Sequence, residues 1–206
     1  MKSIREQFGQ TLSDLAKKNK KIVAISCDLR GACKLNTFAK KFPKRFIEVG
    51  IAEANGVGIA SGLALNGFKP FLASFSSFIT GKNIEIRCSI SYNNSPVVII
   101  GTHGGMIGAD GATQSGLQDI SVMRSLPNFH VYQPCSNLET TQIIDHVSKL
   151  DKPAYVRIAR NVIPEFLPKN YKFKFKKLTT IKNGKEIAII SSGPMLYNCL
   201  KAIEKI

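Results

Sequence analysis

The chain has 206 residues, and 44% of them are hydrophobic, which is enough apolar material for the core of one domain and part of another. The formal net charge of +15 suits anionic ligands or an acidic partner, but the basic residues are scattered and accompany no nucleic-acid-binding motif. No apolar run is as long as a membrane span and the N-terminus lacks an apolar signal core, so we expect a cytoplasmic protein that binds neither membrane nor nucleic acid.

The N-terminal half alternates between helical and strand patterns. A first amphipathic helix is indicated by apolar residues at helical spacing: Ile4, Phe8, Leu12 and Leu15. Three strands are expected at "KIVAISCD", "RFIEVG" and "KPFLASF". The helices between and after them are expected at "LNTFAKKFP", at the Gly- and Ala-rich segment that starts at Glu53, and at "SSFITGKNIEIRCSISY".

The alternation continues through the second half. The clearest strand, "SPVVIIGTH", is an apolar run typical of parallel sheets, and the glycine-rich loop "GGMIGADGATQSG" follows it. Then come a helix, a strand, a helix and a strand, at "LQDISVMRSL", "FHVYQP", "SNLETTQIIDHVSKL" and "PAYVRIA". This order predicts an α/β fold with a mainly parallel sheet and helices on both faces.

Composition changes after residue 161 and suggests three parts. Residues 1–161 should form the main domain. Residues 162–185 are rich in proline and lysine and are expected to be a linker, with an exposed edge strand where Tyr171, Phe173 and Phe175 alternate with lysines. Residues 186–206 should be the truncated start of a further α/β domain, because one strand and one helix are too little to bury a core.

The cysteine and histidine patterns favour neither a disulfide framework nor a zinc site. The five cysteines are odd in number and lack C-x-x-C spacing, and the three histidines form no ligand pattern. We therefore expect reduced cysteines, most of them in the core, and no metal site within this chain.

One acid, Glu53, lies within a long stretch of small and apolar residues, "VGIAEANGVGIASGLALNG". Taken alone, it would be an acid in the first turn of a helix, favoured there by the helix dipole. The glycines around it permit close approach by another backbone or by a flat ligand. His103 marks a second place of interest, because it ends the strongest strand, at the edge where parallel α/β sheets bind ligands.

Three segments together carry a resemblance to a known family: "FIEVGIAEANGVGIASGLALNGFKPFLASFSSFI", "GTHGGMIGADGATQSGLQDISVMRSLPN" and "PAYVRIAR". In order and spacing they resemble the pyrimidine-binding domain of the transketolases, which use thiamine diphosphate. The resemblance covers about residues 3–206, and its form is that of split transketolases, in which the C-terminal half is a separate chain.

The resemblance implies a catalytic role for Glu53 and a cofactor site around it. Glu53 matches the glutamate that hydrogen-bonds N1′ of the aminopyrimidine and favours its imino tautomer. An apolar pocket suits a carboxyl group that shares a proton with a ring nitrogen. Phe75 and Phe78 match aromatic positions that pack on the pyrimidine, with Phe78 as the direct stacking partner. Gly81 stands where the family often has another aromatic residue.

The resemblance also implies a sugar-phosphate site. His103 and Arg160 match residues that bind the substrate phosphate, and Asp110 matches an aspartate that reads a sugar hydroxyl. Arg157 falls on the other side of the expected strand and is a candidate for a structural ion pair. Gln114 stands where many relatives have a histidine; it can still donate and accept hydrogen bonds but cannot act as a cationic acid, which suggests a changed substrate.

The sequence lacks the Gly-Asp-Gly triplet that opens the diphosphate and Mg²⁺ clamp of these enzymes. The resemblance therefore implies an N-terminal transketolase subunit as partner, which would hold most of the Mg²⁺ and diphosphate, in a dimer or heterotetramer. The expected activity is transfer of a two-carbon ketol unit between sugar phosphates. The alternatives are a subunit like deoxyxylulose-phosphate synthase or a 2-oxo acid dehydrogenase beta chain, or an inactive scaffold or regulatory pseudo-subunit.

Overall fold

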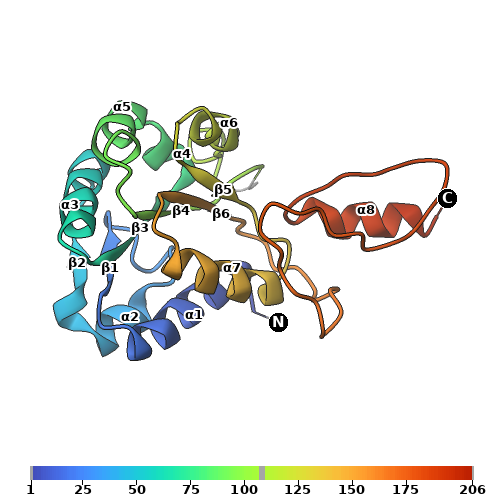
Figure 1. The fold of residues 1–206 in the computed structure, drawn as a ribbon, viewed down its shortest axis with the longest axis horizontal. Coiled ribbons are helices and arrows are strands. Elements are labelled where there is room, and N and C mark those ends of the chain that lie inside the picture. The colour runs from blue at the N-terminus through green and yellow to red at the C-terminus, as the bar shows by residue number, and fades with distance from the viewer. Residues whose placement is uncertain (1, 107–109, 206) are drawn as a thin grey trace.

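The computed structural model describes residues 2–106 and 110–205, and its centre is a six-stranded parallel sheet (Figure 1). The strands are β1 (Ile22–Ser26), β2 (Phe46–Glu48), β3 (Lys69–Phe75), β4 (Val98–Thr102), β5 (His130–Tyr132) and β6 (Ala154–Ile158). They lie in the order β2-β1-β3-β4-β6-β5, and every neighbouring pair is parallel. The predicted α/β class with a parallel sheet is confirmed.

Helices cover both faces of the sheet, because side chains alternate along each buried strand. Ile22 and Ala24 of β1 pack on one side with α1 (Ile4–Lys18), α2 (Asn36–Lys41) and α7 (Asn137–Lys149). Val23 and Ile25 pack on the other side with α3 (Glu53–Leu65), α4 (Ser76–Thr80), the π-helical η2 (Ile86–Ser91) and α6 (Asp119–Arg124). Figure 1 shows these two groups on opposite sides of the strands.

Two segments differ from the elements expected for them. The helical segment after β3 is divided into α4, a short α5 (Asn83–Glu85) and η2 rather than one helix. A short 3-10 helix, η1 (Pro43–Arg45), separates α2 from β2. None of the helices in residues 2–106 and 110–205 is long and apolar enough to cross a bilayer.

The proline- and lysine-rich segment forms no edge strand, which corrects the expectation. The backbone at Tyr171 and Phe173 instead hydrogen-bonds to the side chain of Gln142 on α7. Phe173 and Phe175 pack against a group of rings that includes His146. The aromatic residues are half-buried and the lysines between them are exposed, so the alternation in the sequence reports packing on a helix.

The expected strand at residues 186–192 is also absent, whereas the helix after it forms as α8 (Met195–Ile203). This helix has no buried residue, and Figure 1 shows it apart from the layered domain. Ser192 contacts Gln133 of the domain, and the ring of Tyr197 packs on Phe166 in the segment that follows β6. A strand requires a neighbour for its backbone hydrogen bonds, and the described residues offer none here.

The cysteines are all unpaired, as expected, but only three of them are buried: Cys27, Cys33 and Cys135. Cys88 is exposed on η2, and Cys199 is half-buried on α8. The predicted placement of most cysteines in the core holds for three of the five.

Candidate functional site

The site residues predicted from the sequence gather at the carboxyl edge of the sheet. Phe75, Thr102 and Ile158 are paired in register at the ends of β3, β4 and β6. The residues that follow them, including His103 and Arg160, therefore emerge side by side. This edge is where ligands bind in open parallel sheets, because the chain there turns from strands into loops and helix N-termini.

Glu53 is the first residue of α3 and is only 6% exposed. The Ser74 hydroxyl donates a hydrogen bond to its Oε1 at 2.9 Å, and among the described residues no other donor reaches this carboxylate. The helix lies close to the sheet because Gly56 has no side chain: a Cβ there would be 3.1 Å from Leu72 Cδ1. A buried carboxylate with one oxygen held and the other without a described partner can bond a ring nitrogen.

Two phenylalanines form an aromatic surface at the end of β3. The rings of Phe75 and Phe78 are stacked with centroids 5.2 Å apart and an interplanar angle of 15°. The ring of Phe75 also packs on the imidazole of His103, with centroids 3.8 Å apart. Ser74, the partner of Glu53, and Phe75 are the last two residues of β3, so the carboxylate and the aromatic surface both lie at the carboxyl end of this strand.

His103 directly follows β4 and is held in the left-handed region, at φ 59°. Its Nε2 lies 3.3 Å from Arg5 Nη1, which can only donate, so Nε2 accepts. Its Nδ1 then carries the proton and donates to Thr102 Oγ1 at 3.0 Å, and that hydroxyl donates to the Ser74 carbonyl. Burial, together with the positive charge of Arg5, lowers the pKa of His103 to about 4, so the ring is neutral at pH 7.

Arg5 is the functional candidate that the sequence reasoning missed. It lies in the first turn of α1, donates to the Ala32 carbonyl at 3.0 Å and meets His103 across 98 residues of sequence. Burial and the nearby Arg160 lower its pKa, so two cations lie close together. A positive charge in a helix's first turn opposes the helix dipole, and this was the one available signal.

Asp110 and Arg160 form an ion pair, in which Arg160 Nη1 donates to Asp110 Oδ2. Asp110 and Arg160 thus belong to the same cluster of side chains as Arg5 and His103. Gln114 follows in the same loop, where its backbone carbonyl accepts from Ser77 Oγ at 3.1 Å. Its side-chain Oε1 accepts from Thr113 Oγ1, which leaves the amide NH₂ as a donor.

Arg157 forms an ion pair with Asp119, which lies at the start of α6. Gly81 ends α4, and a Cβ there would meet the Phe78 carbonyl at 3.3 Å. The Cβ of an aromatic residue at position 81 would therefore lie close to the Phe78 carbonyl.

These residues fit the pyrimidine half of thiamine diphosphate better than its diphosphate half. Glu53 offers a carboxylate oxygen to a ring nitrogen, and Phe75 with Phe78 offers a flat apolar surface. The described ranges contain no group of three or more His, Cys, Asp or Glu side chains that could hold a metal ion.

Comparison with known proteins agrees with this arrangement. The family model of the transketolase pyrimidine-binding domain matches residues 1–165. The chain is 35% identical to a subunit of the apulose-4-phosphate transketolase of Phocaeicola vulgatus and 36% identical to a putative transketolase C-terminal section of Methanocaldococcus jannaschii. In both cases the match covers 98% of this chain, and this chain spans 66% of the relative's length.

Further relatives and solved structures extend the comparison. The chain is 32% identical to 1-deoxy-D-xylulose-5-phosphate synthase of Natranaerobius thermophilus, covering 98% of this chain and 32% of that protein. A solved split-gene transketolase, described as an inactive beta4 tetramer, superimposes with a TM-score of 0.89 at 35% identity, covering 98% of this chain and 66% of that one. The transketolase from Leishmania mexicana shares the fold, with a TM-score of 0.72 at 22% identity. The match covers 77% of this chain and 25% of the Leishmania chain. The chain belongs to the transketolase family, through its pyrimidine-binding domain.

Proposed function

We propose that this chain is the pyrimidine-binding, C-terminal subunit of a split transketolase that transfers a two-carbon ketol unit between sugar phosphates. The observation that carries the proposal is the shared site at the carboxyl edge, where the buried Glu53 and the Phe75–Phe78 surface adjoin the cationic group of Arg5 and Arg160. A cofactor ring and an anionic substrate would each have their recognition groups within one site.

Glu53 is proposed as the catalytic residue toward the cofactor. Ser74 fixes the carboxylate through Oε1, so the other oxygen is oriented to hold a proton at a pyrimidine nitrogen. Phe78 and Phe75 hold the ring flat and exclude water. When bound, thiamine diphosphate supplies the electron sink for breaking the carbon–carbon bond beside a ketone.

Arg5 and Arg160 are proposed to bind the substrate phosphate, with His103 and Asp110 beside them. Because His103 is neutral at pH 7, the positive charge for an anion comes from the two arginines. His103 orients Arg5 through its Nε2. Asp110, which pairs with Arg160 in the structure, offers carboxylate oxygens to a sugar hydroxyl, and Gln114 offers an amide donor.

The diphosphate half of the cofactor and its Mg²⁺ are proposed to be held mainly by an N-terminal transketolase subunit. The proposal is supported by the sequence, which lacks Gly-Asp-Gly, and by relatives whose names describe subunits or sections. The two kinds of chain would assemble as a heterotetramer with sites shared between them.

The test is purification of the tagged chain from its own cells, with mass spectrometry of stoichiometric partners and an assay for bound thiamine diphosphate. We expect a partner with Gly-Asp-Gly followed by asparagine, bound cofactor, and ketol transfer from a ketose phosphate to an aldose phosphate. Absence of both partner and cofactor would instead favour the pseudo-subunit.

A second candidate activity is that of deoxyxylulose-phosphate synthase, because a relative with that name is 32% identical across this chain. Such an enzyme would consume pyruvate and release CO₂, whereas a transketolase would do neither. Incubating the assembly with pyruvate and an aldose phosphate, and measuring CO₂, separates the two activities.

A further inference from the structure

The glycine-rich loop between β4 and α6 is closed at its base by a buried network. Gly104 and Gly116 form an isolated parallel bridge, and the Gly105 N–H donates to the Gly116 carbonyl at 2.9 Å. Asp110 and Gln114, the two proposed substrate residues of the loop, lie between these ends. The position of both side chains therefore depends on how the base is held.

Arg157 holds that base from β6. Its Nη2 donates to the Gly116 carbonyl at 2.7 Å and lies 3.0 Å from Asp119 Oδ1 at the start of α6. A single nitrogen thus connects the end of the loop with the helix that follows. The Arg157 side chain is 13% exposed and that of Asp119 is 0% exposed, so the pair is shielded from competing water.

The glycines at the base are required by close contacts with this network. A Cβ on Gly104 would lie 2.5 Å from both Cγ and Nε of Arg157. A Cβ on Gly116 would lie 1.8 Å from Ser76 Oγ, on the helix that carries Phe78. The loop base is therefore fitted against β6 on one side and against α4 on the other.

We propose that Arg157 is a positioning residue: it fixes the base of the loop and thereby sets where Asp110 and Gln114 stand, without touching substrate. Tyr155, two residues before Arg157 on β6, holds the same partner, because its hydroxyl donates to Asp119 Oδ2 at 2.7 Å. Burial raises the pKa of Tyr155, so this hydroxyl remains a donor. The consequence for substrate rests on the function proposed above, whereas the closure of the loop base does not.

Two variants loosen the base by different routes. Arg157→Lys keeps a positive charge for Asp119, but its ammonium ends one bond short of the guanidinium nitrogens and cannot form the same pair of contacts. Gly104→Ala retains Arg157 and displaces it by the close contact of the new methyl group. Tyr155→Phe is the matched control, because it removes a hydrogen bond from the same Asp119 carboxylate and leaves the bond from Arg157 to Gly116.

The first readout is amide hydrogen exchange at Gly105, followed by NMR on the full chain, with unfolding curves to confirm that each variant folds. We expect Arg157→Lys and Gly104→Ala to speed exchange at Gly105 by roughly tenfold, the size of one lost charged hydrogen bond. Tyr155→Phe should leave that exchange within about twofold, even if it lowers stability as much.

The second readout is kinetics of the assembly with its partner subunit. The two loosening variants should raise KM for the sugar phosphate roughly tenfold, change kcat less than about threefold, and leave thiamine diphosphate retention unchanged. Unchanged Gly105 exchange in both variants, or equal acceleration in Tyr155→Phe, overturns the proposal. If the wild-type assembly transfers no ketol unit, the proposed function fails, and the exchange data still decide whether Arg157 holds the loop.

Discussion

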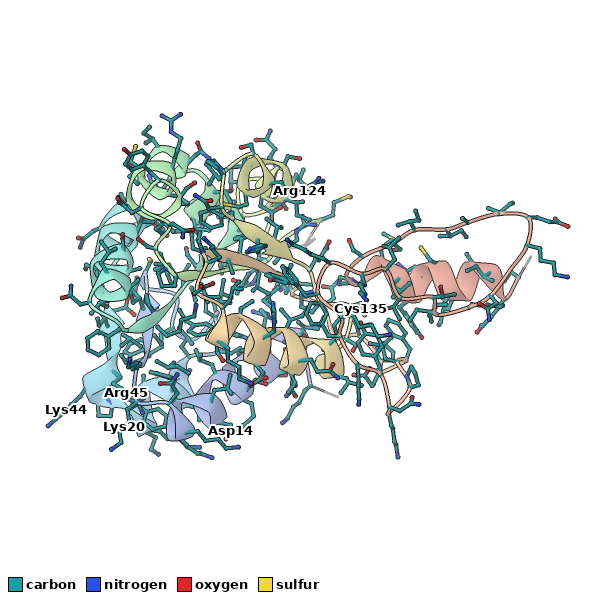
Figure 2. The ribbon with its side chains drawn as sticks, viewed as in Figure 1. Asp14, Lys20, Lys44, Arg45, Arg124 and Cys135 are labelled. Atoms are coloured by element: carbon teal, nitrogen blue, oxygen red, sulfur yellow. The ribbon has the colours of Figure 1, made fainter. Side chains whose placement is uncertain are left out.

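The two edges of the sheet use their cations in opposite ways. At the amino edge, where β1, β2 and β3 begin, the Arg45 guanidinium bonds to the backbone: it donates to three carbonyls, those of Ala16, Asn19 and Ile22. Figure 2 shows Arg45 with Lys20 and Lys44 at this end of the molecule. At the carboxyl edge, Arg5 and Arg160 lie near each other, and their partners include side chains: Arg5 contacts His103 and Arg160 pairs with Asp110.

Lys69 extends the pattern of the amino edge into the interior. It is 7% exposed at the start of β3, and its Nζ donates to the carbonyls of Pro96 and Leu150 at 2.9 and 2.6 Å. Cations bonded to carbonyls complete the ends of helices and strands. Cations held beside one another raise the energy of the empty site and favour an anion that brings negative charge. We therefore expect the first edge to serve stability and, with the function proposed above, the second edge to serve binding.

The largest expected effect is on catalysis at the carboxyl edge. Glu53→Gln retains size and burial but removes the acid that would share a proton with the cofactor ring. We expect kcat of the assembled enzyme to fall roughly 10²–10⁴-fold, the usual contribution of a positioned acid or base. Thermal unfolding should change little, since the amide can still accept from Ser74. A variant with full activity would mean that Glu53 is only a helix-end acid.

The next largest effect is on stability, from Lys69→Met. This variant leaves two buried carbonyls without partners, and we expect the free energy of unfolding to fall by about 3 kcal/mol near pH 7. Catalysis in the assembly should be unchanged within about twofold, because the position is at the far edge. Urea unfolding monitored by circular dichroism measures the first quantity.

The same variant has a defined pH dependence. Burial lowers the pKa of Lys69 to about 8, below its usual 10.5. Between these values the unfolded chain keeps a proton that the folded chain has released, so raising the pH stabilises the fold. The stability difference between wild type and Lys69→Met should therefore grow from pH 8 to pH 10. A constant difference would contradict the assignment.

A pair of arginine variants compares the two edges directly. Arg5→Met should raise KM for the sugar phosphate roughly 30-fold, as expected for losing one charged contact of about 2 kcal/mol. Arg45→Met should leave KM unchanged and lower the free energy of unfolding by about 1–2 kcal/mol. If both variants changed stability alone, the distinction between a binding edge and a structural edge would fail.

Arg5 also shows where sequence reasoning stops. Most strands and helices of the main domain followed from apolar runs and their spacing, because these patterns report burial on one or both faces. Glu53, Phe75 and Phe78 could be proposed because their short segments match a family. The contact of Arg5 with His103 joins residues 98 apart and leaves no local pattern. It exists only because α1 packs beside the end of β4.

The C-terminal segment shows a different limit. The apolar residues at 187–190 have the composition of a strand, yet Ile187 and Ile190 are 79% and 77% exposed and no strand forms. Strand propensity reflects a surface to pack on and a neighbour to bond, not the segment alone. The aromatic residues of the preceding segment pack on α7 instead. Their alternation with lysines predicted that one side is buried, but not that a helix covers it.

The smallest expected effect concerns Gln114, which stands where the family resemblance implies a histidine. Thr113 Oγ1 donates to the side-chain oxygen of Gln114 and Ser77 Oγ donates to its backbone carbonyl, which leaves the amide NH₂ group as a donor. Gln114→His would substitute a ring that can carry a proton near neutral pH, which a neutral amide cannot do. We expect the ratio of kcat/KM between two ketose phosphate donors to change roughly three- to tenfold, in favour of the donor that better accepts a charged hydrogen bond. Gln114→Asn, which keeps the amide but shortens its reach, is the control that separates loss of contact from gain of a proton. An unchanged ratio in Gln114→His would mean that position 114 does not select the substrate, and the choice of sugar would then rest with Asp110 and the arginines beside it.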